Sequence, residues 1–121
     1  MFNTGGVLPL PGYLERVREL TTRYNAVLIF DEVITGFRVS SGGAQRVLGV
    51  TPDLTILGKA LANGFAVAAI VGKKEIMDLI GDAKVMHGGT YNSQSVSMAA
   101  TVATLKLLKS EAPHQAIAKT G

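Results

Sequence analysis

The feature that most constrains the fold is an uninterrupted apolar run over residues 26–30, which is followed at once by two acids, Asp31 and Glu32. The run is Ala-Val-Leu-Ile-Phe, is partly β-branched and is bounded by polar residues, which is typical of a strand with both faces buried. Strands of that kind occur in parallel sheets that helices cover. The run therefore predicts α/β architecture.

Further strands and helices are expected to alternate along the chain. Residues 54–57 and 66–71 are predicted to form two more short strands. One helix is expected directly after the Pro11-Gly12 turn. Three more are expected over residues 42–49, 74–79 and 93–108. This alternation supports the α/β class.

Three short strands are too few for a self-sufficient sheet of this class. Both faces and both edges of such a sheet stay partly uncovered, although its strands are built for burial. With 121 residues, the chain has room for one small domain at most. We therefore expect the chain to be a fragment of a larger fold.

Composition excludes several kinds of site. The chain has no cysteine, which excludes disulfides, thiol nucleophiles and cysteine-ligated zinc or iron–sulfur clusters. The lack of cysteine also suits a cytoplasmic protein. The two histidines, His87 and His114, have no metal-ligand spacing, so no metal site is expected.

Charge and hydropathy argue against two classes of partner. The net charge of +3 is spread along the chain, and only Lys73 and Lys74 are adjacent basic residues, so we expect no nucleic-acid partner. The longest strongly apolar run covers residues 65–71, which is too short to span a bilayer, so we expect no membrane partner.

Asp31 and Glu32 are the first candidates for chemistry because ligands of open α/β sheets bind beyond the carboxyl ends of the strands. A carboxylate there is partly desolvated and needs a cation or hydrogen-bond donors. The acids could also cap the turn after the strand, or handle magnesium and water as in P-loop ATPases. A nucleotide-hydrolysing α/β domain would need a G-x-x-x-x-G-K-[ST] loop, which is absent here and would have to lie upstream.

Lys59 is the second candidate. It follows Gly58 at the end of the second predicted strand and precedes the apolar residues 60–62. Apolar surroundings favour an uncharged amine, which can form imines. On its own, this residue would more often be a solvent-facing lysine. Because Asp31 and Lys59 both follow core strands, however, we expect them to share one crevice.

A glycine-rich stretch, residues 88–90, ends at Thr90 and could offer backbone N–H groups and a hydroxyl to a phosphate. A phosphate site, an imine-forming lysine and a carboxylate for a ring nitrogen are the three groups that pyridoxal phosphate (PLP) requires. Asp31, Lys59 and Thr90 could supply these groups, although short glycine-rich loops are common and on their own are a weak signal.

The same residues carry a resemblance to a known family. The two-part signature of class III PLP-dependent aminotransferases resembles, in residue type and spacing, the segments 28–33, 35–38, 52–55, 58–59 and 63–64. The run over residues 11–45 is most similar to the glutamate-1-semialdehyde 2,1-aminomutase branch. The segments after Lys59 and Thr90 look more like other class III transaminases, so both activities stay open.

The resemblance implies a fold and a domain context. Residues 1–121 would be an internal fragment of the PLP-binding large domain of fold type I, a mostly parallel sheet flanked by helices. The upstream phosphate-loop segment and the C-terminal small domain would be missing, so the isolated fragment is expected to be inactive. A truncated product with no catalytic role is a further alternative. The complete protein is expected to be a homodimer that acts on a small amino or oxo substrate.

The resemblance also implies a role for each site residue. Lys59 would be the catalytic residue and would bind PLP through a Schiff base. Asp31 would pair with the pyridinium nitrogen, and Val33 would pack against one face of the ring. Thr90 would bind the phosphate, commonly that of the neighbouring subunit. The implied activity is PLP-dependent amino-group transfer, in which Lys59 moves a proton between the substrate carbon and the C4′ carbon of the cofactor.

Overall fold

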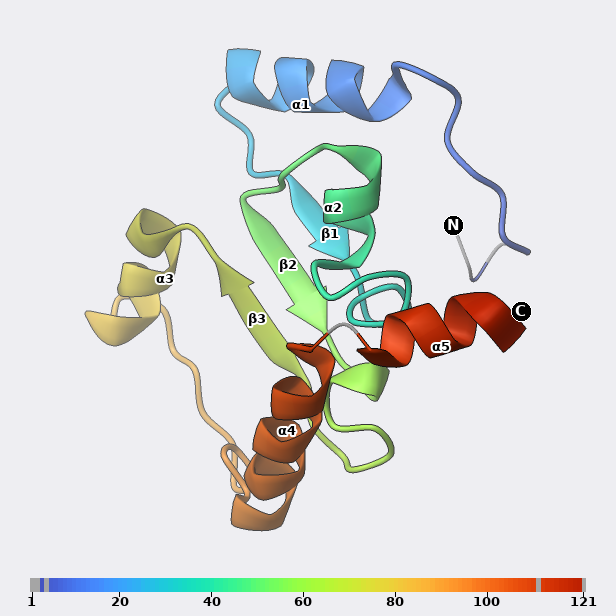
Figure 1. Cartoon of the computed structure of the whole chain (residues 1–121). Coiled ribbons are helices and arrows are strands. Elements are labelled where there is room, and N and C mark those ends of the chain that lie inside the picture. The colour runs from blue at the N-terminus through green and yellow to red at the C-terminus, as the bar shows by residue number, and fades with distance from the viewer. Residues whose placement is uncertain (1–2, 4, 111, 121) are drawn as a thin grey trace.

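Helices and short strands alternate in the computed structural model, which describes residues 3, 5–110 and 112–120 (Figure 1). The elements are α1 (Tyr13–Arg23), β1 (Ile29–Asp31), α2 (Gly43–Leu48), β2 (Leu54–Leu57), the 3₁₀ turn η2 (Lys59–Leu61), β3 (Ala69–Gly72), α3 (Lys74–Gly81), α4 (Ser95–Leu108) and α5 (Ala112–Thr120). The predicted α/β class is confirmed. Strand β1 begins later in the apolar run than expected, and α5 has no counterpart among the predicted helices.

The three strands form one sheet in the order β1–β2–β3. Strands β1 and β2 are parallel, with Ile29 opposite Leu54, as the apolar run predicts. Strand β3 runs antiparallel to β2, so the sheet is mixed rather than mostly parallel at this edge. The difference has a physical reason. The connection from β2 to β3 contains only the turn η2 and a reversal near Asn63, whereas a parallel pair needs a longer crossover, usually with a helix.

The parallel pairing of β1 and β2 sets the position of the site. Both strands end at the same edge of the sheet, and the loop between β1 and α2 curls beyond that edge (Figure 1). Asp31 is the last residue of β1, and Lys59 follows β2 after Gly58. The topology therefore places an acid and an amine at neighbouring strand ends.

Burial within this chain is modest, and one expectation is wrong here. Val27 and Ile29, which belong to the run predicted to be buried on both faces, are 52% and 50% exposed. A sheet of so few strands buries too little surface to cover both faces. The buried apolar residues are Leu28, Ala44, Val50, Leu61 and Ala62.

Two polar contacts hold the last two helices against the rest of the chain. Ser97 of α4 is buried and donates from Oγ to the backbone oxygen of Ala66, 2.9 Å away. In α5, Nε2 of His114 lies 2.9 Å from the backbone oxygen of Phe37, in the loop between β1 and α2. Across the described residues, no helix combines the length and apolar character needed to cross a membrane.

Asp53 is a buried carboxylate that joins α1 to the sheet. One oxygen, Oδ2, accepts hydrogen bonds from the backbone N–H of Leu28 at 2.7 Å and from Nη1 of Arg18 at 2.9 Å. The other, Oδ1, lies 2.7 Å from Nζ of Lys73, which the antiparallel course of β3 brings back to this end of the sheet. The hydrogen bonds from Lys73, Leu28 and Arg18 outweigh the effect of burial and lower the pKa of Asp53 from 3.8 to about 2.

We expect Asp53→Asn to destabilise the complete protein by roughly 1–3 kcal/mol near neutral pH, because it removes the buried carboxylate that pairs with the more exposed Arg18 and Lys73. The folded-state pKa is lower than the unperturbed value, so the ionised carboxylate stabilises the fold above about pH 4. That stabilisation is lost as the pH falls towards about 2. Urea unfolding at several pH values should show that the difference in free energy of unfolding between the parent protein and Asp53→Asn decreases over this range. A gap that stays constant down to about pH 2 would contradict the assignment.

Candidate active site

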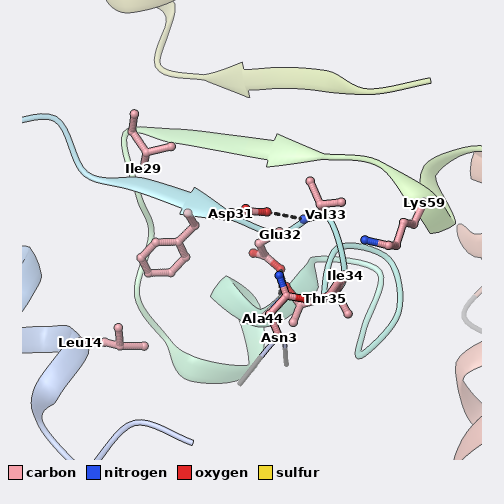
Figure 2. Close-up of a pocket in the computed structure, with 11 residues that line it drawn as sticks. Asn3, Leu14, Ile29, Asp31, Glu32, Val33, Ile34, Thr35, Ala44 and Lys59 are labelled. Atoms are coloured by element: carbon pink, nitrogen blue, oxygen red, sulfur yellow. Dashed lines mark hydrogen bonds between the residues drawn. The ribbon is translucent and has the colours of Figure 1, made fainter. Parts of the chain in front are cut away.

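Asp31, Val33 and Lys59 line one cavity of about 380 Å³ at the carboxyl ends of β1 and β2. Figure 2 shows the Lys59 amine pointing towards the end of β1, with Val33 between it and Asp31. The acid and the amine therefore share a crevice, as their positions after parallel strands predict. The other lining residues are Asn3, Leu14, Ile29, Phe30, Glu32, Ile34, Thr35 and Ala44.

Asp31 is held in place by the chain that follows it. Its Oδ1 accepts a hydrogen bond from the backbone N–H of Val33 at 3.0 Å, drawn as a dashed line in Figure 2. This bond spans two residues and fixes the side chain at the turn after β1. Its other oxygen, Oδ2, has no hydrogen-bond partner among the residues that the structure describes. The carboxylate is exposed and can accept a further hydrogen bond from a ligand in the cavity.

Lys59 has an unusual backbone. Its φ is +41°, in the left-handed region that an L-residue other than glycine or asparagine rarely adopts, at a cost of about 1 kcal/mol. Its carbonyl accepts the hydrogen bond of the Asn63 N–H at 3.0 Å, which helps to fix the turn. Before it, a Cβ on the buried Gly58 would meet Val33 Cγ1 at 3.4 Å, so the strand end packs closely against Val33. Five other described non-glycine residues also have a positive φ, so this conformation supports a functional site only together with the cavity that Lys59 lines.

Glu32 has a role that the sequence did not reveal. Its side chain is 1% exposed, and both carboxylate oxygens accept hydrogen bonds from within the chain. Oε2 accepts from the backbone N–H of Ala44 at 2.5 Å and from Oγ1 of Thr35 at 2.9 Å. Oε1 accepts from the backbone N–H of Gln45 at 3.0 Å and from its Nε2 at 3.1 Å. Glu32 therefore holds the first turn of α2 and is not available to magnesium or water, which argues against nucleotide hydrolysis.

Two glycines leave room for this arrangement. Gly43 has a φ of +68°, and a Cβ there would lie 2.3 Å from Oε2 of Glu32. A Cβ on Gly36 would lie 2.7 Å from the backbone oxygen of Glu32 and 2.7 Å from Cδ2 of Leu57. Any side chain at either position would displace Glu32, the loop after β1, or the end of β2.

Thr90 lies apart from the other three predicted site residues. It belongs to the exposed loop between α3 and α4, and it does not line the cavity of Asp31 and Lys59. The structure thus brings together Asp31, Val33 and Lys59 but leaves Thr90 outside. The predicted contact of Thr90 with a phosphate, commonly the neighbouring subunit's, stays a prediction.

Comparison with known proteins places this geometry in a family. Residues 3–121 match the family model of aminotransferase class-III. The chain is 51% identical over 116 residues to a glutamate-1-semialdehyde 2,1-aminomutase of Sulfolobus acidocaldarius. The matched region covers 95% of this chain and 28% of that protein. The chain is also 47% identical over 114 residues to a 3-aminobutyryl-CoA aminotransferase of Cloacimonas acidaminovorans. Here the matched region covers 94% of this chain and 27% of that protein. The chain thus spans little more than a quarter of the length of these relatives.

A solved structure described as a transaminase with PLP bound has the same arrangement of elements. It is 37% identical to this chain, with a TM-score of 0.78 over 85% of this chain and 25% of its own length. The family match extends over nearly the whole sequence, and the fold and the two-part signature agree with it. The chain belongs to the class-III aminotransferase family.

Proposed function

We propose that the complete protein is a PLP-dependent enzyme of amino-group transfer and that residues 1–121 are an internal part of its PLP-binding large domain. The observation that carries the proposal is the shared cavity of Asp31 and Lys59 at the ends of two parallel strands. Membership of the class-III family and the likeness to a transaminase with PLP bound support it. The phosphate-loop segment and the small domain would lie in the remainder of the complete protein.

The side chains of the cavity fit PLP. The cofactor needs an amine that can bond to its aldehyde, an acceptor for its ring N–H and an apolar contact for its ring face. Lys59 offers the amine, Asp31 the acceptor, and Val33 lies between them (Figure 2). The residue types and their order along the cavity therefore match the three parts of the ring system.

The proposed mechanism assigns one task to each residue. Bound PLP supplies an electron-withdrawing ring that stabilises negative charge on the substrate carbon. Asp31 would accept the ring N–H at a carboxylate oxygen and would keep that proton on the nitrogen. Lys59 would hold the cofactor through Nζ, and the same amine would take up a proton from the substrate carbon and return it to a neighbouring carbon. Val33 covers one ring face and excludes water from it.

The two named relatives illustrate two forms of the reaction. One relative is named an aminomutase and the other an aminotransferase. An aminomutase moves the amino group within one carbon skeleton, whereas an aminotransferase needs a second substrate to receive it. Assays of a small amino substrate with and without an added oxo acceptor would separate the two.

We further propose that the complete protein is a homodimer in which Thr90 binds the phosphate of the neighbouring subunit's cofactor. The exposed position of Thr90, outside the cavity of its own chain, supports this arrangement. Cytoplasmic location stays a prediction that depends on the lack of cysteine.

Borohydride reduction of the complete protein, followed by peptide mapping, tests the proposed function. We expect one cofactor adduct, on Lys59, while the surface residues Lys73 and Lys74 stay unmodified. An adduct on another lysine would refute the assignment of Lys59. A complete protein that shows neither an adduct nor visible absorbance after incubation with PLP would contradict the proposed function.

A further inference from the structure

We propose that Glu32, Gln45 and Thr55 form a buried polar brace that sets the position of Asp31 relative to Lys59. Glu32 is then a positioning residue for the reaction, because its carboxylate oxygens are bonded to donors within the chain. This inference rests on the proposed function, because it concerns the geometry of the same cavity.

The brace crosses from the loop after β1 to the strand that leads to Lys59. The side-chain amide of Gln45 donates from Nε2 to Oε1 of Glu32 at 3.1 Å and lies 3.3 Å from Oγ1 of Thr55. Thr55 lies in β2, is 4% exposed, and pairs with Phe30 in the register between the strands. One amide therefore links the residue after Asp31 to the middle of the neighbouring strand.

The two successive acids have separate tasks. Side chains alternate between the two faces along a strand, so Asp31 and Glu32 point in different directions. Asp31 is exposed in the cavity, whereas Glu32 is buried against the first turn of α2. The backbone N–H of Glu32 also donates to the oxygen of Ile56 in β2 at 2.9 Å. A shift of the Glu32 side chain would therefore move the backbone that carries Asp31 and Val33.

The chemistry of the brace requires a carboxylate at position 32. All four groups that reach Glu32 are donors, namely two backbone N–H groups, the hydroxyl of Thr35 and the amide of Gln45. A glutamine in its place would turn an NH₂ group towards some of these donors, and the buried contacts on that side would be lost. Glu32→Gln is therefore a nearly isosteric change that breaks the brace and leaves Asp31 intact.

The test compares Glu32→Gln, Gln45→Met and Thr55→Val in the complete, PLP-loaded protein, with Glu75→Gln as the control because Glu75 is exposed on α3. We expect Glu32→Gln to lower kcat per bound cofactor by about tenfold to a hundredfold, with KM for the amino donor within about twofold. The pH midpoint of the visible cofactor band should also shift, because Asp31 no longer meets the ring nitrogen in the same geometry.

The two smaller changes test whether the brace acts as a unit. Gln45→Met removes the amide, and Thr55→Val removes the oxygen that receives it. We expect each to lower kcat severalfold, and the double variant should be no slower than Gln45→Met alone, because both changes break the same link. If the kcat losses of the two single variants add up in the double variant, the two contacts are unrelated, and the proposed brace would be overturned.

A merely structural role would give a different pattern. A lower melting temperature with an unchanged kcat per bound cofactor and an unchanged spectrum would overturn the proposal. If Glu32→Gln does not fold, Gln45→Met and Thr55→Val test the proposal in its place. If both have the same kcat as Glu75→Gln, the proposal is overturned. If borohydride reduction of the parent protein gives no cofactor adduct on Lys59, the proposed function is contradicted, and the proposed brace is contradicted with it. A labelled Lys59 together with a fully active Glu32→Gln would defeat the brace alone.

Discussion

Lys59→Ala should lower kcat for amino-group transfer by roughly a thousandfold or more while the protein stays folded, because in the proposed mechanism Nζ is both the covalent anchor and the proton carrier. The methyl group that replaces it can do neither. Folding should survive because the Lys59 side chain is exposed and the hydrogen bond that closes its turn is made by its backbone carbonyl. Steady-state rates at saturating donor, together with circular dichroism, measure the two effects separately.

The matched control is Lys74→Ala, which removes another exposed lysine that pairs with Asp78 on the surface of α3. Its kcat should equal that of the parent protein. A small primary amine in solution should restore part of the rate of Lys59→Ala, because it can replace Nζ as the base. A Lys59→Ala protein that keeps more than about a tenth of the parent kcat would show that another group carries the proton.

Asp31→Asn should lower kcat by about a hundredfold, the second largest effect that we expect. The neutral amide can still receive the hydrogen bond of the Val33 N–H, so the loop should keep its course. It cannot hold a proton on the ring nitrogen as a carboxylate does, so the ring withdraws electrons less strongly. The visible spectrum of the bound cofactor, titrated with pH, should show the change directly.

Asp82→Asn provides the control for this change because Asp82 is an exposed carboxylate at the end of α3. Its activity should match that of the parent protein. An Asp31→Asn protein within about twofold of the parent kcat would contradict the role of Asp31 in holding the ring nitrogen. The shared cavity would then have to serve some other ligand.

The elements that the sequence predicted well have local signals. A continuous apolar run predicts β1, and turn residues with helical spacing predict α1 and α2. The rule that ligands bind beyond the carboxyl ends of parallel strands placed Asp31 and Lys59 in one cavity. These inferences need only neighbouring residues and one topological rule.

Other features depend on partners that are distant in the sequence. Three of the four donors to Glu32 come from residues 12 and 13 positions away, and Arg18 lies 35 positions from Asp53. Several of these donors are backbone N–H groups, which leave no mark in the sequence. The available signal was weak: an acid next to an apolar strand, at position 32 and again at position 53.

The burial of β1 could not be judged from the chain alone. The residue type of Ile29 predicts a buried side chain, yet it is half exposed here. Burial depends on whatever packs over the sheet, and the chain corresponds to about 28% of the length of a relative that is 51% identical to it. The direction of β3 was likewise undetermined, because it depends on the path of the turn after Lys59.

The left-handed backbone of Lys59 implies a conflict between robustness and reactivity at this position. Glycine there would relax the chain and make the folded protein more resistant to heat, but it would remove the reactive amine. Sequences selected only for thermal endurance would therefore drift away from lysine at residue 59. If Nζ has the proposed role, lysine is kept at this position for its amine and at a cost in backbone strain.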